Sequence, residues 1–205
     1  EEPTVFNLAT GDHAITQQVE VTNPNARNIV IKGDVKTQVS CTAIAKVSGS
    51  AKNYLIKYTL TDASEVAVGD YIYVGYTAGT GNYNVAEGVW KVTAKSGNDV
   101  TVKHTLNATW PTIAVTSARV IPLKTILRWP TSQRGLAISG CQLRGIENLV
   151  LASQFDISSG TPTDSYSDGL QVGTAADQLN TASSESQQTN AGSVWLTNVG
   201  IVEWE

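Results

Sequence analysis

Three acidic residues in the C-terminal part of the chain could together cleave a glycosidic bond. Glu147 stands two positions before Leu149, and Asp168 stands two positions before Leu170. If the strands that contain these leucines stack as neighbours, the two carboxylates lie about 4.8 Å apart. Glycosidic cleavage needs two carboxyl groups about 5 to 9 Å apart, and repulsion at that distance raises one pKa and makes a general acid. Asp156, between them in the sequence, is a further candidate.

These carboxylates also have an ordinary structural interpretation. Asp168 is followed by glycine, and that pair is typical of a turn. Glu147 would then be an exposed residue of a strand edge. The sequence leaves both interpretations open.

Aromatic residues gather in the middle of the chain, where they could bind sugar without any catalysis. Pyranose rings pack their C–H faces on flat aromatic rings, beside side chains that form hydrogen bonds. Two-residue alternation puts Tyr71 and Tyr73 on one face of a strand and Ile72 and Val74 on the other, so one set must be partly exposed. The rings could instead fill the core of a small barrel. The candidates are Tyr71, Tyr73, Tyr76, Tyr83 and Trp90.

Short apolar strands between turn residues must position these candidates. Ile29-Val30-Ile31 ends at Gly33-Asp34, and similar runs recur at 136–138, 149–151, 170–172 and 194–196. Leu149 and Leu170 are 21 positions apart, and Leu170 and Val194 are 24 apart. A strand that returns every 20 to 25 residues or so predicts a solenoid whose neighbouring coils bury each other, as in a parallel β-helix.

The pattern changes between about Ser40 and Ile121. Longer alternating strands appear, and Tyr54, Ile56, Tyr58 and Leu60 share one face of the first. Turn residues at 96–99 join two further strands. We therefore expect an all-β chain with first coils over 1–39, an inserted small antiparallel sheet or barrel over 40–121, and continuing coils over 122–205.

Composition and charge exclude several classes of function. The 205 residues carry a net charge of −4 and no cluster of Lys and Arg, so nucleic acid is not an expected partner. No apolar run is long enough to span a membrane, and none follows a basic n-region as in a secretion signal. The absence of methionine predicts a piece of a larger protein.

Metal and cofactor motifs are also missing from the sequence. Cys41 and Cys141 lack the spacing of a zinc site and could be either unpaired or joined in a disulfide. His13 and His104 are far apart in the sequence, so no metal site is expected from them. Gly79-Thr80-Gly81 lacks the third glycine of a dinucleotide fingerprint, and we expect no cofactor.

The first 34 residues, with 11–15 leading to 28–34, resemble the opening coil of bacteriophage tailspikes and tail fibres. Proteins of this family have a pectate-lyase-like right-handed β-helix. Residues 68–71 and 88–92 are similar to the small β-module that these proteins insert between early coils. The resemblance resumes at 123–127, 148–151 and 168–172.

The resemblance implies a homotrimer in the virion tail that contacts other phage tail proteins, binds polysaccharide on the bacterial surface for host adsorption, and sometimes cleaves it. Cleavage would make it a polysaccharide depolymerase that uses Glu147, Asp156 or Asp168. The chain departs from the family in length, because it holds few coils and a catalytic groove usually needs more. A bacterial surface or secreted β-helix unrelated to phage is the third alternative.

Overall fold

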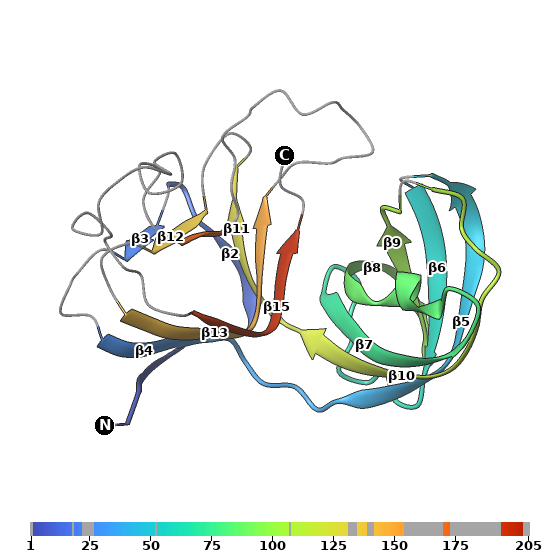
Figure 1. Ribbon diagram of the computed structural model, residues 1–205, viewed down its shortest axis with the longest axis horizontal. Helices are drawn as coiled ribbons and strands as arrows, with labels where there is room; N and C mark the ends of the chain where they lie inside the picture. The colour runs from blue at the N-terminus through green and yellow to red at the C-terminus, as the bar shows by residue number, and fades with distance from the viewer. Residues whose placement is uncertain are drawn as a thin grey trace, which may run out of the picture. The chain divides into compact units, whose positions relative to one another are not determined.

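The computed structural model describes residues 2–17, 19–21, 27–51, 53–106, 108–130, 135–138, 142–153, 170–172 and 194–202. In these ranges every regular element is a β-strand except one 3-10 helix, η1 (Tyr83–Ala86) (Figure 1). None of the described helical residues forms a segment long and apolar enough to cross a membrane. The chain forms two compact units, and the second, residues 35–124, is inserted between Asp34 and Thr125 of the first.

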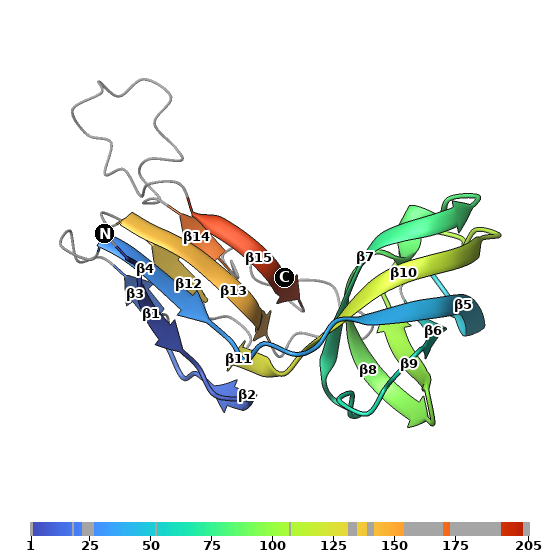
Figure 2. The same cartoon turned by 90° about the horizontal axis from the view of Figure 1, so that it is seen from below.

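Parallel strands build the first unit. Residues 1–34 contribute β1 (Thr4–Asn7), β2 (Gly11–Ala14), β3 (Val19–Val21) and β4 (Arg27–Lys32), and the part after the insertion contributes β11 (Thr125–Trp129), β12 (Leu136–Ile138), β13 (Gln142–Ser153), β14 (Leu170–Val172) and β15 (Trp195–Val202). One sheet has the order β1-β4-β13-β11-β2 with β15 also on β13, and a second has the order β14-β12-β3 (Figure 2). Successive passes of the chain therefore add strands to the same sheets.

The longest strand of this unit bends at an asparagine. The first half of β13 pairs with β4, at Glu147↔Lys32, and the second half pairs with β11, at Val150↔Ile126. Asn148 stands between the halves with a φ of 54°, in the left-handed region that asparagine adopts more readily than most residues. The two halves of β13 therefore lie on two different faces of the unit. The sequence pattern indicated only a three-residue strand at 149–151.

The inserted unit leaves and rejoins the first one at the same corner. The amide of Asp34 donates to Oγ1 of Thr125 at 3.0 Å, and that buried hydroxyl donates to the carbonyl of Ala9 at 3.1 Å. Gly33 precedes the exit, and a Cβ built on it would lie 2.2 Å from the carbonyl oxygen of Asn148. The close stacking of neighbouring passes therefore requires glycine at 33.

The apolar runs that predicted the strands form the core of the first unit. Ile138, Ile146, Leu149 and Leu151 are fully buried beside Trp129, whose indole Nε1 donates to the carbonyl of Gln17 at 3.0 Å. The strands expected at 136–138 and 170–172 occur with those bounds. The apolar runs thus mark the strands correctly.

The expected stacking of two of these strands is wrong. Leu170 of β14 pairs with Leu136 of β12, and Leu149 of β13 pairs with Val199 of β15 in the other sheet. The strands that contain Leu149 and Leu170, which are 21 residues apart, occupy different positions within one pass of the chain and belong to different sheets. Hydrophobicity marks a strand in the same way whichever sheet it joins, so the spacing alone could not assign the partner.

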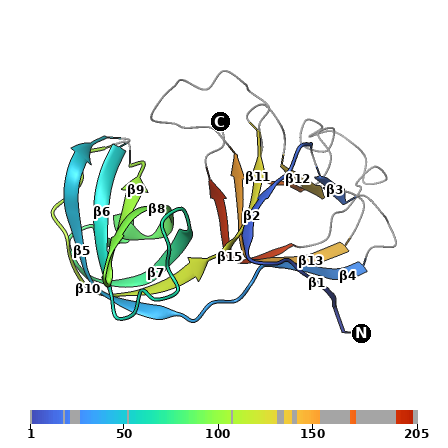
Figure 3. The same cartoon turned by 180° about the vertical axis from the view of Figure 1, so that it is seen from behind.

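The second unit is a closed antiparallel barrel with the strand order β10-β5-β6-β9-β8-β7 (Figure 3). Its strands are β5 (Val39–Ser50), β6 (Asn53–Leu60), β7 (Tyr71–Thr80), β8 (Gly88–Ser96), β9 (Asp99–His104) and β10 (Ala114–Leu123). The alternation in β6 is confirmed, because Tyr54, Ile56, Tyr58 and Leu60 all point into the core. Closure removes free sheet edges, which otherwise invite pairing with other chains. The sequence pattern missed β5 and β10.

Candidate functional site

An exposed aromatic surface lies on the outer face of β7. Ile72 and Val74 are buried in the barrel core, so Tyr73 between them points outward. Its ring lies along the strand over Gly75, because a Cβ built on that glycine would be 2.9 Å from Oη of Tyr73. The glycine therefore allows the tyrosine ring to lie flat on the barrel surface.

Tyr76 continues this surface, and a β-bulge orients it. Arg119 of β10 pairs with Gly75 and Ser117 pairs with Ala78, so Tyr76 and Thr77 stand opposite a single residue. Tyr76 has a φ of 51° and its side chain is 73% exposed. The guanidinium carbon of Arg119 lies 4.5 Å from the centre of the Tyr76 ring. We call Tyr73, Tyr76 and Arg119 the tyrosine–arginine patch.

A carboxylate holds the bulge in place. The backbone amide and the hydroxyl of Thr77 both donate to Oε1 of Glu87, at 2.9 and 2.8 Å. A bulge leaves an amide outside the ladder between strands, and here Glu87 accepts it. Because Thr77 follows Tyr76 directly, this contact also fixes where the exposed ring stands.

Two of the other predicted aromatic residues lie elsewhere. Tyr71 is only 1% exposed, with the ammonium of Lys91 5.9 Å from its ring centre. Trp90 packs against the barrel core and donates from Nε1 to the carbonyl of Ala86 at 3.0 Å. Tyr83 begins η1, and its side chain lies outside the described part of the structure. The structure thus brings Tyr73 and Tyr76 together and separates Tyr71 and Trp90 from the exposed surface.

Trp90 stacks on a buried histidine. The rings of Trp90 and His104 lie 3.7 Å apart at 27°, and Trp110 meets the histidine edge-on. The amide of Leu106 donates to Nδ1 of His104, so Nε2 carries the hydrogen and donates to the carbonyl of Val85 at 2.8 Å. Burial lowers the pKa of His104, and the Val85 carbonyl acts in the opposite direction. Both ring nitrogens are therefore occupied, and the neutral imidazole serves packing.

Arg119 was not among the residues predicted from the sequence. Its neighbours Ala118 and Val120 are buried, so the alternation in β10 would have placed it outward had the strand been recognised. The short side chains of β10 and the proline at 122 hid that strand.

The predicted catalytic carboxylates are only partly described. Oε2 of Glu147 lies 3.6 Å from Nζ of Lys32, and both side chains are one third exposed. Asp156 and Asp168 lie outside the described residues. Because the Leu149 and Leu170 strands do not stack, the expected separation of the Glu147 and Asp168 carboxylates loses its basis. Cleavage by these residues stays a prediction.

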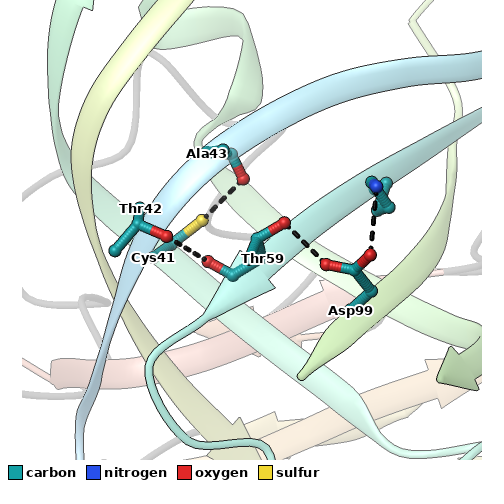
Figure 4. A network of polar contacts seen from close by, with 6 residues as sticks. Cys41, Thr42, Ala43, Thr59 and Asp99 are labelled. Atoms are coloured by element: carbon teal, nitrogen blue, oxygen red, sulfur yellow. Dashed lines mark hydrogen bonds and ion pairs between the residues drawn. The ribbon is translucent and has the colours of Figure 1, made fainter. Parts of the chain in front are cut away.

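A polar network surrounds the cysteine of the barrel (Figure 4). Cys41 is a free, buried thiol that donates to the carbonyl of Ala43, and burial raises its pKa to about 11. Beside it, Oγ1 of Thr59 donates to Asp99 at 2.6 Å, and the ammonium of Lys57 pairs with the same carboxylate at 3.0 Å. Together they lower the pKa of Asp99, with the Thr59 hydrogen bond as the larger cause. Cys41 is thus unpaired in the structure, which is one of the two alternatives from the sequence, and Cys141 lies outside the described residues.

Other polar groups of the barrel are satisfied internally. A cavity of about 250 Å³ is lined by Asp62 and Glu65, among other residues. Asp62 accepts the amide of Ser64 at 2.8 Å, and Glu65 accepts the amide of Thr37 at 3.2 Å. Within the described ranges, no group of three or more His, Cys, Asp or Glu could hold a metal ion.

No family model and no curated protein matches this sequence. Solved structures similar to this one include the tailspike gp61 of Pseudomonas phage phi297, with 12% identity and a TM-score of 0.34 over 98% of this chain and 38% of that chain. The Gp54 tailspike of Acinetobacter baumannii bacteriophage AP22, solved in complex with A. baumannii capsular saccharide, has 12% identity and a TM-score of 0.28 over 97% of this chain and 41% of that chain. The chain thus spans about two fifths of the length of these tailspikes.

A structure of another class is similar at the same level. The siderophore interacting protein from A. baumannii has 11% identity and a TM-score of 0.32 over 80% of this chain and 78% of that chain. Phage tailspikes, which the sequence pattern resembles, are therefore among the structural neighbours of this chain. At TM-scores of 0.34 and below, these likenesses do not establish its function.

Proposed function

We propose that this chain is a segment of a bacteriophage tailspike or tail fibre that binds polysaccharide on the bacterial surface during host adsorption. The tyrosine–arginine patch is the observation that carries the proposal. It joins two outward tyrosine rings to a cation on a closed barrel whose edges are all paired. Flat rings beside a hydrogen-bond donor are what a pyranose ring needs from a protein surface.

The first unit would be the scaffold of this binding module. We take its passes to be coils of a right-handed parallel β-helix, because β1, β4 and the first half of β13 stack in one series while β3, β12 and β14 stack in another. Every strand pair in the described part of the unit is parallel, and right-handed connections between parallel strands are the rule. The barrel would then be an insertion at one corner of the second coil.

We also propose that the chain forms a trimer, and exposed apolar side chains on β15 support this part of the proposal. The last described strand, β15, pairs only with β13 and exposes Trp195, Leu196 and Ile201 by 71%, 48% and 44%. Large apolar side chains exposed together on one strand are typical of a surface that contacts another subunit. Light scattering at two protein concentrations tests this: a mass near three times 21.8 kDa supports the trimer, and a concentration-independent monomer contradicts it for this chain.

Binding to purified bacterial polysaccharides tests the site itself. Tyr73→Ala and Tyr76→Ala should each weaken binding by about tenfold, because stacking of a sugar on one exposed ring contributes roughly 1 kcal/mol or more. Tyr76→Phe is the matched control, since it keeps the ring and removes only the hydroxyl. Equal binding by wild type and both alanine variants would remove the patch from the function.

A further inference from the structure

We propose that the tyrosine–arginine patch selects acidic polysaccharides, with Arg119 binding a carboxylate carried by the sugar. This inference rests on the function proposed above and names the substrate class of the same site. A sugar ring would stack on the tyrosines while its carboxylate receives two hydrogen bonds from the guanidinium.

Three other described cations pair with carboxylates, whereas Arg119 lies on an exposed tyrosine ring. Lys57 pairs with Asp99 at 3.0 Å, Lys124 pairs with Asp70 at 2.7 Å, and Arg128 contacts Asp12 at 2.9 Å. Arg119 has no ion pair with a carboxylate among the described residues, and its guanidinium lies on the Tyr76 ring instead. The N–H groups of the Arg119 guanidinium are therefore available to form hydrogen bonds with an anion.

Stacking on Tyr76 also prepares the guanidinium for binding. A free arginine loses rotamer freedom when it binds, and a guanidinium already held on a ring loses less. The planar fork matches the two oxygens of a carboxylate, whereas a lysine ammonium would offer only a point charge. The contact with Tyr76 thus favours a carboxylate over a neutral hydroxyl as the group recognised.

The spacing of the patch suits one sugar residue. Arg119 is the direct strand partner of Gly75, and the ring of Tyr73 lies over that glycine. Neighbouring strands are about 4.8 Å apart, close to the width of one pyranose ring. A ring stacked over Gly75 would hold its exocyclic carboxylate at the guanidinium without a second sugar between them.

The backbone supports a binding role for the same residues. Tyr76 is a bulky residue with a φ of 51°, a conformation that costs energy and persists where neighbours enforce it. Glu87 enforces it through its two hydrogen bonds with Thr77. Those bonds engage Oε1 of Glu87, so this carboxylate has partners other than Arg119.

An array of purified bacterial capsular and O-antigen polysaccharides tests the inference, with each acidic polysaccharide present in native and carboxyl-reduced form. The full chain should bind acidic polysaccharides at least about tenfold more tightly in native form. Arg119→Gln should lose about that factor for native acidic polysaccharides and leave the carboxyl-reduced forms within about twofold. Arg119→Lys should fall between wild type and Arg119→Gln, because it keeps the charge and loses the fork.

Lys46→Gln is the matched control for the charge. Its ammonium also lies over a tyrosine, 4.7 Å from the ring centre of Tyr54, but that ring is buried in the barrel. The control removes one positive charge from the same barrel and should leave affinity within about twofold of wild type. A similar loss in Lys46→Gln and Arg119→Gln would indicate a general charge effect and overturn the inference.

The remaining outcomes separate the two proposals. Equal affinity for native and carboxyl-reduced polysaccharides, with unchanged binding by Arg119→Gln, would overturn acidic selectivity and leave polysaccharide binding intact. Failure to bind any polysaccharide of the array would contradict the proposed function and this inference together. Thermal melting of each variant shows that it is folded before its binding is compared.

Discussion

Asn198 donates a hydrogen bond from its side-chain nitrogen to the side-chain oxygen of Asn148 at 2.8 Å. The two residues occupy equivalent places in neighbouring passes of the chain, because Glu147 pairs with Thr197 and Leu149 pairs with Val199. Both have φ near 50°, at 54° for Asn148 and 51° for Asn198. Asparagine therefore has two roles where the strand bends. It tolerates the left-handed backbone, and its side-chain amide forms a hydrogen bond between one pass of the chain and the next.

The first prediction concerns this corner. Asn148→Ala should lower the free energy of unfolding by about 2 kcal/mol, because it removes a partly buried hydrogen bond and forces alanine into the left-handed region. Asn148→Gly should cost only about half as much, since glycine accepts that backbone and loses only the amide contact. Urea unfolding curves of both variants measure the difference. An equal cost would show that backbone strain is not part of the effect.

Gly33 provides a second prediction about the same corner. Gly33→Ala should destabilise the protein by about 2 kcal/mol or more, because the new methyl group would stand 2.2 Å from the Asn148 carbonyl oxygen and 2.9 Å from Cβ of Thr125. Gly97→Ala is the control: its φ is 57°, so alanine is strained there, but nothing lies within 4 Å of the new atom. If Gly97→Ala has the larger effect on the thermal midpoint, close stacking is not what requires glycine at 33.

The third prediction separates binding from stability at Gly75. A methyl group there would meet the ring end of Tyr73, with Oη at 2.9 Å, and the far end of this half-buried, outward-pointing side chain can swing away from it. Gly75→Ala should therefore change the free energy of unfolding by less than about 1 kcal/mol. It should still weaken polysaccharide binding several-fold, because the displaced ring no longer lies flat. Calorimetric melting and titration with the polysaccharide measure the two effects, and unchanged binding would exclude Tyr73 from the site.

A fourth prediction follows from the buried His104. Its folded pKa is lowered by burial from an ordinary value of 6.5, so the unfolded chain binds the proton more readily than the folded one. Its contribution to stability is therefore present above pH 6.5 and is lost as the pH falls from there toward the folded pKa. The melting temperature should drop between about pH 7.5 and about pH 5.

His13 supplies the control for that measurement, since it and His104 are the chain's two histidines. His13→Gln is measured beside His104→Gln as the matched replacement of a histidine. His104→Gln should be less stable at neutral pH, because it loses the stack on Trp90, but should show a flatter slope. A slope that survives in His104→Gln would assign the pH dependence to other groups.

The sequence by itself determined the all-β class, the presence of a small antiparallel module in the middle of the chain, and the identity of many strands. Each of these follows from local physics: alternation in Tyr54, Ile56, Tyr58 and Leu60 indicates a strand with one buried face, and Gly97 supplies the positive φ of the hairpin turn. The runs at 136–138 and 170–172 were found for the same reason, because a fully buried strand must be apolar throughout.

Only the tertiary structure decided which strands pair and which rings reach the surface. Tyr71 and Tyr73 have the same type and the same place in the alternation, yet Tyr71 is buried and Tyr73 lies over Gly75 on the outer face. The bulge that turns Tyr76 outward depends on Glu87, ten positions away, and Arg119 reaches that ring from a strand that the pattern did not reveal. Contacts between residues distant in the sequence set these positions, and side-chain periodicity carries no information about them.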